Sequence, residues 1–118
     1  MWEIEYTDEF GAWWETLDSE VQESIAASVE LLRQLGPHLP RPHADTVRGS
    51  KHSNMKELRT QHAGRPIRTF FAFDPRRCAI LLIGGDKTGD DRFYERMIRL
   101  ADDLYDSHFQ TLRNEGLI

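Results

Sequence analysis

Cysteine, long apolar runs and an even spread of charge are all lacking in this chain of 118 residues. Cys78 is the only cysteine, so no disulfide within the chain supports the fold, and a reducing compartment suits the composition. The longest apolar run, Cys78–Ile83, is much shorter than the roughly 20 residues of a membrane-spanning helix. The first residues also lack the basic and apolar regions of a signal peptide, so we expect a cytoplasmic protein without a membrane segment.

Lysine and arginine are absent from residues 1–32, which contain nine aspartates and glutamates. Residues 33–77 reverse this pattern with ten lysines and arginines against three acids, and residues 78–118 have five bases and eight acids. The formal net charge of -5 therefore hides a basic middle segment between acidic ends. Such a segment can attract a polyanion such as nucleic acid, although charge runs are more often simply solvated.

Length and composition predict one compact domain over residues 1–118. The chain has the usual size of a single domain, and 39% hydrophobic residues provide a core that needs neither disulfides nor metal ions.

The N-terminal part predicts a strand and two helices. Apolar residues alternate with polar ones over residues 2–7, which is the period of a half-buried strand at or near a sheet edge.

From residue 10 to residue 35 the apolar spacing is three or four, which is typical of an amphipathic helical face. A polar interruption divides this face, and the capping-box spacing of Ser19 and Gln22 marks the start of a second, longer helix. Gly36–Pro37 ends that helix. Residues 37–53 contain three of the five prolines, and we expect them to form no regular structure.

Three β-rich segments follow at residues 55–61, 66–73 and 78–83, and the short turns between them predict an antiparallel meander. A glycine-rich turn then leads into a last helix, whose apolar face runs from Tyr94 to His108. The order predicts an α+β domain. Its antiparallel sheet contains the short N-terminal strand and the meander, and an N-terminal helical hairpin and a C-terminal helix cover one face.

Five cations fall on or just after the predicted meander strands: Lys56, Arg59, Arg65, Arg68 and Lys87. Cations on adjacent strands form a fixed array that can hold phosphate oxygens and stabilise the charge that develops in phosphoryl transfer. A solvated basic face, or ion pairs with the acidic helices, would explain the same residues. Tyr94 follows closely and can donate a proton or stack on a base, or it can be a core tyrosine.

Neither a metal site nor a nucleoside triphosphate site is indicated. The spacings of His38, His43, His52 and His62 match no common zinc motif, although a histidine near a substrate would titrate near neutral pH. The turn from Gly84 to Thr88 departs from the phosphate-binding loop pattern, and its glycines serve more simply as turn residues between strand and helix.

Four segments together resemble the HigB branch of the RelE/ParE toxin superfamily: Met55–Arg59 (MKELR), Gly64–Phe73 (GRPIRTFFAF), Ala79–Lys87 (AILLIGGDK) and Phe93–Ala101 (FYERMIRLA). The resemblance implies a RelE-like fold and the toxin of a type II toxin–antitoxin pair. Such a toxin cuts mRNA, commonly on the ribosome, without a metal ion or other cofactor. A cognate antitoxin, of the helix-turn-helix HigA type, is implied as the partner.

The resemblance also implies roles for individual residues. Arg59 and Arg68 would bind the scissile phosphate, and Lys56 and Lys87 would stabilise the attacking oxygen and the phosphorane. Tyr94 would stack on a base or assist proton transfer. Further RNA contacts are expected from other cations of the chain: Arg48, Lys51, Arg65, Arg76 and Arg77.

Glu57 stands where some RelE-type enzymes have a second lysine. It can act as a base in the cleft, or it can form a structural ion pair with Arg59. Two further functions remain open, since one fold hosts several: inhibition of gyrase in the manner of ParE, and binding without catalysis by a phage-derived protein. In each case we expect an antitoxin segment across the cleft or along the helices, and negative charge on it would favour the basic face.

Overall fold

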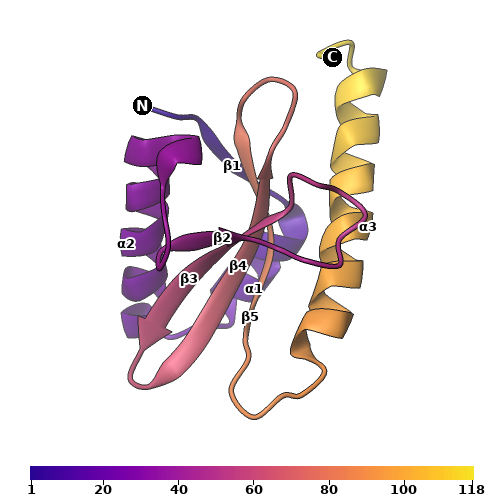
Figure 1. Cartoon of the computed structure of the whole chain (residues 1–118). Helices are drawn as coiled ribbons and strands as arrows, with labels where there is room; N and C mark the ends of the chain where they lie inside the picture. The colour runs from indigo at the N-terminus through magenta and orange to yellow at the C-terminus, as the bar shows by residue number, and fades with distance from the viewer.

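The computed structural model describes residues 1–118 and places a five-stranded sheet between helices (Figure 1). In chain order the elements are β1 (Ile4–Tyr6), α1 (Asp8–Glu15), α2 (Ser19–Leu35), the 3-10 turn η1 (Gly36–His38), β2 (Ala44–Thr46), β3 (Lys56–His62), β4 (Arg65–Phe73), β5 (Ala79–Asp86) and α3 (Phe93–Asn114). The strand order across the sheet is β1-β5-β4-β3-β2.

The predicted meander is confirmed, because β3 pairs with β4 and β4 with β5, both antiparallel. The β3–β4 turn contains Ala63 and Gly64 at φ 49 and 79, the positive values that a tight hairpin turn requires. The N-terminal strand lies at the sheet edge as expected, but β1 runs parallel to β5, so the sheet is mixed. The alternation of residues 2–7 gives a strand its two faces and carries no information about its direction.

The proline-rich segment is more ordered than the sequence predicts. Ala44–Thr46 forms β2, which pairs antiparallel with β3, and residues 36–38 form η1. The expectation that residues 37–53 form no regular structure is therefore wrong for these residues. β2 is short and lies at an edge, where a strand is bonded on one side only and neighbouring prolines are tolerated.

Helices cover both faces of the sheet rather than the single face that we expected (Figure 1). Successive β4 side chains alternate between the two faces, so Phe70 packs with Phe93 of α3 while Phe71 packs with Phe10 of α1. Ile67, on the same face as Phe71, packs against α2. The apolar run Phe70–Phe73 (FFAF) at the end of β4 is typical of a strand segment that is buried on both faces.

Side chains at the helix ends explain where α1 and α2 begin. Thr7 accepts a hydrogen bond from the Phe10 N–H at 2.9 Å and caps α1. Asp18 caps α2 by accepting from the Val21 N–H at 3.0 Å, so the cap lies one residue before the predicted Ser19. Gly36, at φ 56, ends α2 as predicted.

Gly84 on β5 offers a test of how tightly α1 packs on the sheet. A Cβ at this position would lie 2.2 Å from the ring of Trp13, which is itself held by the core. We expect Gly84→Ala to lower the free energy of unfolding by about 1–3 kcal/mol in urea titrations, because overpacking forces strain on the neighbours.

Gly11→Ala is the matched control, because its Cβ would meet the Tyr6 ring at an ordinary 3.4 Å. The free energy of unfolding of this variant should equal that of the wild type or exceed it by up to about 1 kcal/mol, since alanine favours a helix more than glycine does. Equal stability of the two variants would contradict the packing that we describe.

Candidate functional site

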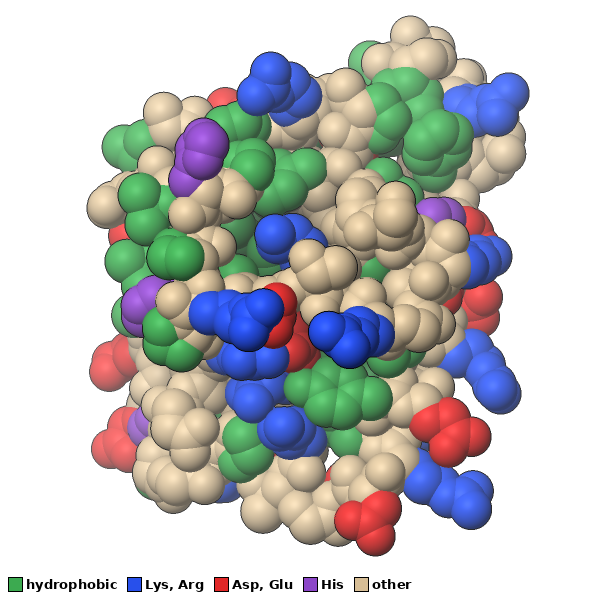
Figure 2. Space-filling model, viewed as in Figure 1, with side chains coloured by type: hydrophobic (Ala, Val, Ile, Leu, Met, Phe, Trp, Pro, Cys, Tyr) green, Lys and Arg blue, Asp and Glu red, His purple; other side chains and the backbone are tan.

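A basic cleft lies between β2, β3 and the start of α3. Its volume is about 610 Å³, which lies within the usual range of about 300–1,000 Å³ for a ligand site. It is lined by Arg41, Asp45, Thr46, Val47, Arg48, Glu57, Arg59, Tyr94 and Ile98. Figure 2 shows lysine and arginine side chains gathered around acidic ones in the middle of this face of the molecule.

Strand register brings two arginines together beside this cleft. Arg59 of β3 lies directly opposite Arg68 of β4, so both side chains are on the face that α3 covers. The Arg68 side chain is 11% exposed, and its Nε donates to the Tyr94 hydroxyl at 3.3 Å. Two like charges opposite each other repel, so this arrangement requires a nearby anion.

Glu57 supplies that anion from the same face of β3. Its Oε2 accepts from Nε and Nη2 of Arg59 at 3.1 and 3.0 Å, and its Oε1 lies 3.6 Å from Arg68 Nε. The Tyr94 hydroxyl donates to Oε1 at 2.7 Å. Because Glu57 is only 4% exposed, its carboxylate is the buried centre of the cluster. The expected ion pair between Glu57 and Arg59 is present, which does not exclude a second role.

Tyr94 and Lys87 form the opposite side of the cluster. Lys87 follows β5, its N–H donates to the Pro66 carbonyl, and its Nζ lies 5.2 Å from the centre of the Tyr94 ring. Burial raises the pKa of Tyr94 and the hydrogen bond to Glu57 raises it further, while Arg68 opposes both. The phenol is therefore protonated at neutral pH and can donate a hydrogen bond or a proton.

Three of the five residues that the family resemblance implies for the reaction meet in one cluster with a fourth beside it. Arg59, Arg68 and Tyr94 are in contact through Glu57, and Lys87 lies against Tyr94. Lys56 does not join them. It is one residue before Glu57 on β3 and opposite Phe71 of β4, so its side chain leaves the other face of the sheet.

Of the five additional cations expected to contact RNA, the structure places Arg48 in the cleft. Arg65 pairs in register with His62 at the hairpin end, and its Nη1 lies 3.6 Å from Asp86, away from the cluster. Lys51 forms a salt bridge with Asp106 of α3. Its loop is tied to α3 by Asp102, which accepts from the Ser50 hydroxyl and from the Lys51 N–H.

Arg76 and Arg77 lie in the β4–β5 turn, beyond the far end of β4 from Arg68. Arg76 donates to both oxygens of Glu5 and to Asp74, and Arg77 stacks its guanidinium over Trp2 at 5.2 Å. Arg76 and Arg77 hold the N-terminal segment against the turn, and neither lines the cleft. The RNA contacts expected of them rested on their place among the cations of the basic segment, since Glu5 and Trp2 are far away in the sequence.

Arg41 and Asp45 line the cleft, although nothing in the sequence reasoning singled them out as site residues. Asp45 Oδ2 lies 3.3 Å from Arg59 Nη2 and 3.4 Å from Arg41 Nε. Recognition of the short strand β2, which carries Asp45, would have pointed to these residues. The prolines just before β2 instead led to the expectation of an irregular loop. No group of three or more His, Cys, Asp or Glu side chains is placed to hold a metal ion. No helix has the length and apolar character needed to cross a membrane.

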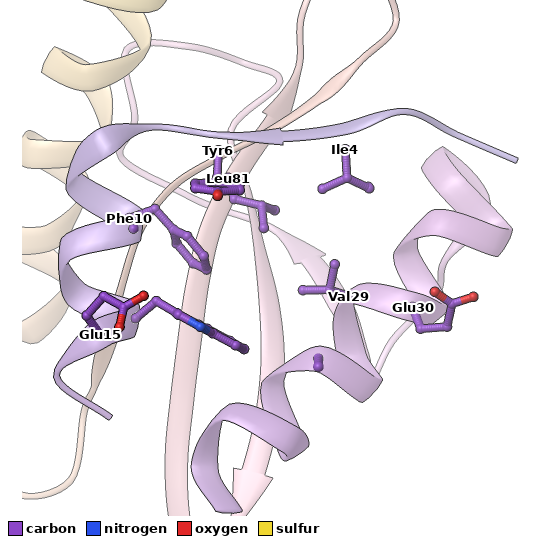
Figure 3. Close-up of a pocket in the computed structure, with 10 residues that line it drawn as sticks. Ile4, Tyr6, Phe10, Glu15, Val29, Glu30 and Leu81 are labelled. Carbon is purple, nitrogen blue, oxygen red and sulfur yellow. The ribbon is translucent and has the colours of Figure 1, made fainter. Parts of the chain in front are cut away.

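A second pocket, of about 460 Å³, lies on the opposite face of the sheet. Figure 3 shows Ile4 and Tyr6 of β1, Phe10 of α1, Val29 of α2 and Leu81 of β5 around it, with Glu15 and Glu30 at its sides. Tyr6 is 65% exposed. The apolar pocket, as we name this site, therefore has a different chemistry from the basic cleft.

Comparison with solved structures identifies the architecture as RelE-like. The isolated E. coli RelE toxin superposes with a TM-score of 0.59 over 85% of this chain and 99% of that chain, at 12% sequence identity. A chain of the intact E. coli RelBE toxin–antitoxin complex gives a TM-score of 0.55 over 72% and 95%, also at 12% identity. The predicted fold class is thereby confirmed.

Sequence comparison then identifies the family. The model of phage derived Gp49-like proteins matches residues 12–106. The Mycobacterium tuberculosis H37Rv protein named "Putative toxin HigB2" is 45% identical over 103 residues, which are 86% of this chain and 51% of that protein. "Putative toxin HigB3" of the same strain is 47% identical over 91 residues, which are 76% and 78% of the two chains.

The chain belongs to the Gp49-like family, is HigB-like in sequence and has a RelE-like fold. This confirms the resemblance that four sequence segments indicated. The chain spans about half the length of the first of these relatives.

The ion pairs of Asp74 with Arg76 and His108 predict that the stability of the fold depends on pH. Burial tends to raise the pKa of Asp74, but hydrogen bonds from Arg76 and His108 outweigh it and hold that pKa below its ordinary value. A depressed carboxyl pKa stabilises the fold above the unfolded value of about 3.9, and the contribution disappears as pH falls through the lower folded value. Asp74→Asn should cost about 1–3 kcal/mol of unfolding free energy at pH 7.

Urea titrations from pH 7 down to pH 3 would measure this difference, which should shrink below about pH 4. Asp103→Asn, at an exposed position of α3 without a salt bridge, is the control and should change little. If the difference in unfolding free energy between Asp74→Asn and wild type stays constant over the whole range, the charge of Asp74 does not contribute to stability as we describe.

Proposed function

We propose that the chain is the toxin of a type II toxin–antitoxin pair and that it cleaves mRNA, on the ribosome, without a metal ion. The observation that carries this proposal is the cluster of Arg59, Arg68, Lys87 and Tyr94 at a cleft of basic character. The HigB-like family and the RelE-like fold support it. Both named M. tuberculosis relatives are described as toxins, and the similar RelE structures are toxins as well.

The chemistry follows from the groups in the cluster. The ribose 2′-hydroxyl attacks the adjacent phosphorus, which leaves a 2′,3′-cyclic phosphate and a 5′-hydroxyl. Arg68 and Arg59 present planar guanidinium groups that can each hold two phosphate oxygens. Preorganised cations in a partly desolvated cleft stabilise the extra negative charge of the phosphorane, since they need no reorientation when the charge develops. Arg41 and Arg48 extend the positive surface along the path of the RNA backbone.

Replacement of Arg68 by alanine tests the phosphate site. We expect Arg68→Ala to slow mRNA cleavage by about 10²–10³-fold in a translating extract, the effect of losing one preorganised charge contact. The ends of the fragments should carry the 2′,3′-cyclic phosphate and the 5′-hydroxyl. Arg65→Ala is the control because Arg65 lies at the hairpin end away from the cluster, and it should cleave like the wild type.

The other two functions give different results in the same extract. Intact mRNA together with a DNA damage response in cells would support inhibition of gyrase. Intact mRNA together with normal growth on overexpression would support a protein that binds without catalysis. Either outcome would remove the endonuclease assignment.

An antitoxin completes the proposal, and we place its docking segment at the apolar pocket. Of the nine acidic residues in the first 32, only Glu5 and Glu30 form salt bridges, so the helices around this pocket carry unneutralised negative charge. Two of the three arginines that line the cleft, Arg41 and Arg59, are already paired with Asp45 or Glu57. A segment that combines apolar side chains with lysine or arginine therefore complements the pocket better than an acidic segment complements the cleft.

Ala26 lines the apolar pocket from α2, while its neighbour Ala27 is also exposed but does not line it. Ala26→Arg should weaken antitoxin binding at least tenfold, which is about 1.4 kcal/mol, because it fills the pocket and repels a basic segment. Ala27→Arg should bind normally. Calorimetric titration with the cognate antitoxin would measure both.

Normal binding by Ala26→Arg, with lost binding by Arg48→Glu, would instead place an acidic antitoxin segment on the cleft. A helix-turn-helix domain in that antitoxin is expected from the HigA resemblance and can be read from its sequence.

A further inference from the structure

The cleft contains one buried carboxylate that the mechanism above does not use. Deprotonation of a 2′-hydroxyl requires a base, and most groups of the cluster cannot serve. Arginine stays protonated at any pH of interest, and protonated lysine only donates. Tyr94 is a neutral phenol, and its hydroxyl donates a hydrogen bond to Glu57. Glu57 is therefore the group in the cluster that can accept a proton.

Asp45 is the other carboxylate of the cleft, and its position is less favourable. It is on the edge strand β2, where it pairs with Arg41 and Arg59, and it makes no contact with Arg68 or Tyr94. Glu57 instead contacts Arg59 and Tyr94 directly and lies 3.6 Å from Arg68 Nε. A phosphate held between the two arginines would place its neighbouring ribose beside Glu57 rather than beside Asp45.

We propose that Glu57 is the general base of the reaction, an assignment that rests on the proposed endonuclease function. Glu57 takes the proton of the 2′-hydroxyl while the bond from O2′ to phosphorus forms and the bond from phosphorus to O5′ breaks. The leaving O5′ receives a proton from the Lys87 ammonium. Water then returns a proton to Lys87 and removes one from Glu57, so no proton is gained or lost over the cycle.

The positions of Glu57 and Lys87 suit this division of labour. Glu57 contacts the hydroxyl end of Tyr94, and Lys87 Nζ lies over the face of the same ring at 5.2 Å from its centre. The two groups are thus separated by the tyrosine, as an in-line displacement with a base on one side and an acid on the other requires. The neutral Tyr94 keeps them from pairing with each other.

Contacts around Glu57 also explain how it can hold its position and still accept a proton. Each carboxylate oxygen has two lone pairs. In the free protein Oε2 accepts twice from Arg59, whereas Oε1 accepts one hydrogen bond, from Tyr94. One acceptor site on Oε1 therefore remains for a 2′-hydroxyl, and a bound phosphate that takes over donors of Arg59 would free further acceptor capacity on Oε2.

A purely structural Glu57 would align the arginines and do nothing else, and the variant Glu57→Gln separates the two roles. We expect single-turnover cleavage of RNA by Glu57→Gln to be about 10²–10⁴-fold slower than by wild type, the usual contribution of a general base. The groups that face Glu57 are Arg59 on β3, Arg68 on β4 and Tyr94 on α3, and Glu57→Gln keeps a hydrogen-bonding side chain of the same size among them.

Binding is measured separately with RNA that has a 2′-deoxyribose at the scissile position and cannot react. Its Kd for Glu57→Gln should stay within about threefold of wild type, whereas misaligned arginines would weaken it further. Glu23→Gln makes the same change at an exposed, unpaired position of α2 and serves as the control with wild-type cleavage.

A sulfur substitution in the RNA tests the base independently of protein folding. RNA with sulfur in place of the scissile O5′ has a leaving group that needs no protonation. Lys87→Ala should be slow on normal RNA and return to within about tenfold of wild type on this substrate, whereas Glu57→Gln should stay slow on both. Recovery of Glu57→Gln on the sulfur substrate would overturn the assignment while leaving the endonuclease function intact. A wild-type protein that leaves RNA uncut would remove both.

Discussion

Arg59 and Arg68 lie opposite each other on β3 and β4, and this pair can exist only because Glu57 lies between them. The carboxylate offsets a repulsion that would otherwise separate the two side chains, and the Tyr94 hydroxyl attaches α3 to the same cluster. Strand pairing, helix docking and the charge of the cleft are therefore joined in one hydrogen-bonded group. A substrate phosphate would meet two guanidinium groups whose positions are already set, which lowers the cost of organising them for catalysis.

Strand alternation decides which cations share this group. The ten lysines and arginines of residues 33–77 fall in one segment of the sequence, but the fold distributes them over both faces and both ends of the sheet. Lys56 leaves the face opposite Arg59, Arg65 lies at the hairpin end, and Arg76 holds β1 through Glu5. The basic segment therefore does not form a uniformly basic sheet. Arg41, Arg48 and Arg59 line the cleft, Arg68 lies beside it, and Lys87 joins them from the end of β5.

Local patterns in the sequence predict part of this fold, and tertiary packing decides the rest. Periodicity predicted the meander, both N-terminal helices and the last helix, because these depend on local spacing and on turn residues such as Gly64 and Gly36. The pairing of Arg59 with Glu57 also followed from alternation along one strand. The parallel direction of β1, the pairing of β2 and the contact of Arg76 with Glu5, 71 positions away, depend on tertiary packing that no local pattern encodes. For that reason the sequence did not single out Asp45 and Arg41 as site residues and did not predict the contact of Arg76 with Glu5.

The separation of chemistry between the two faces bears on how such a protein would be controlled. β4 directs Arg68 and Phe70 to the face of the cleft and Phe71 to the face of α1, next to the apolar pocket. A partner bound in the apolar pocket would therefore not touch Glu57 or Tyr94, since the sheet lies between them. Under the proposed function, a partner bound on that side can inhibit in two ways. It can act by its bulk, because a toxin that carries a bound protein cannot enter a confined site on the ribosome. It can also shift α1, and β5 would transmit that shift toward the cleft. The packing of Trp13 against Gly84 makes α1 and β5 close neighbours, whereas the cleft residues on β3 lie two strands further across the sheet, which favours exclusion by bulk.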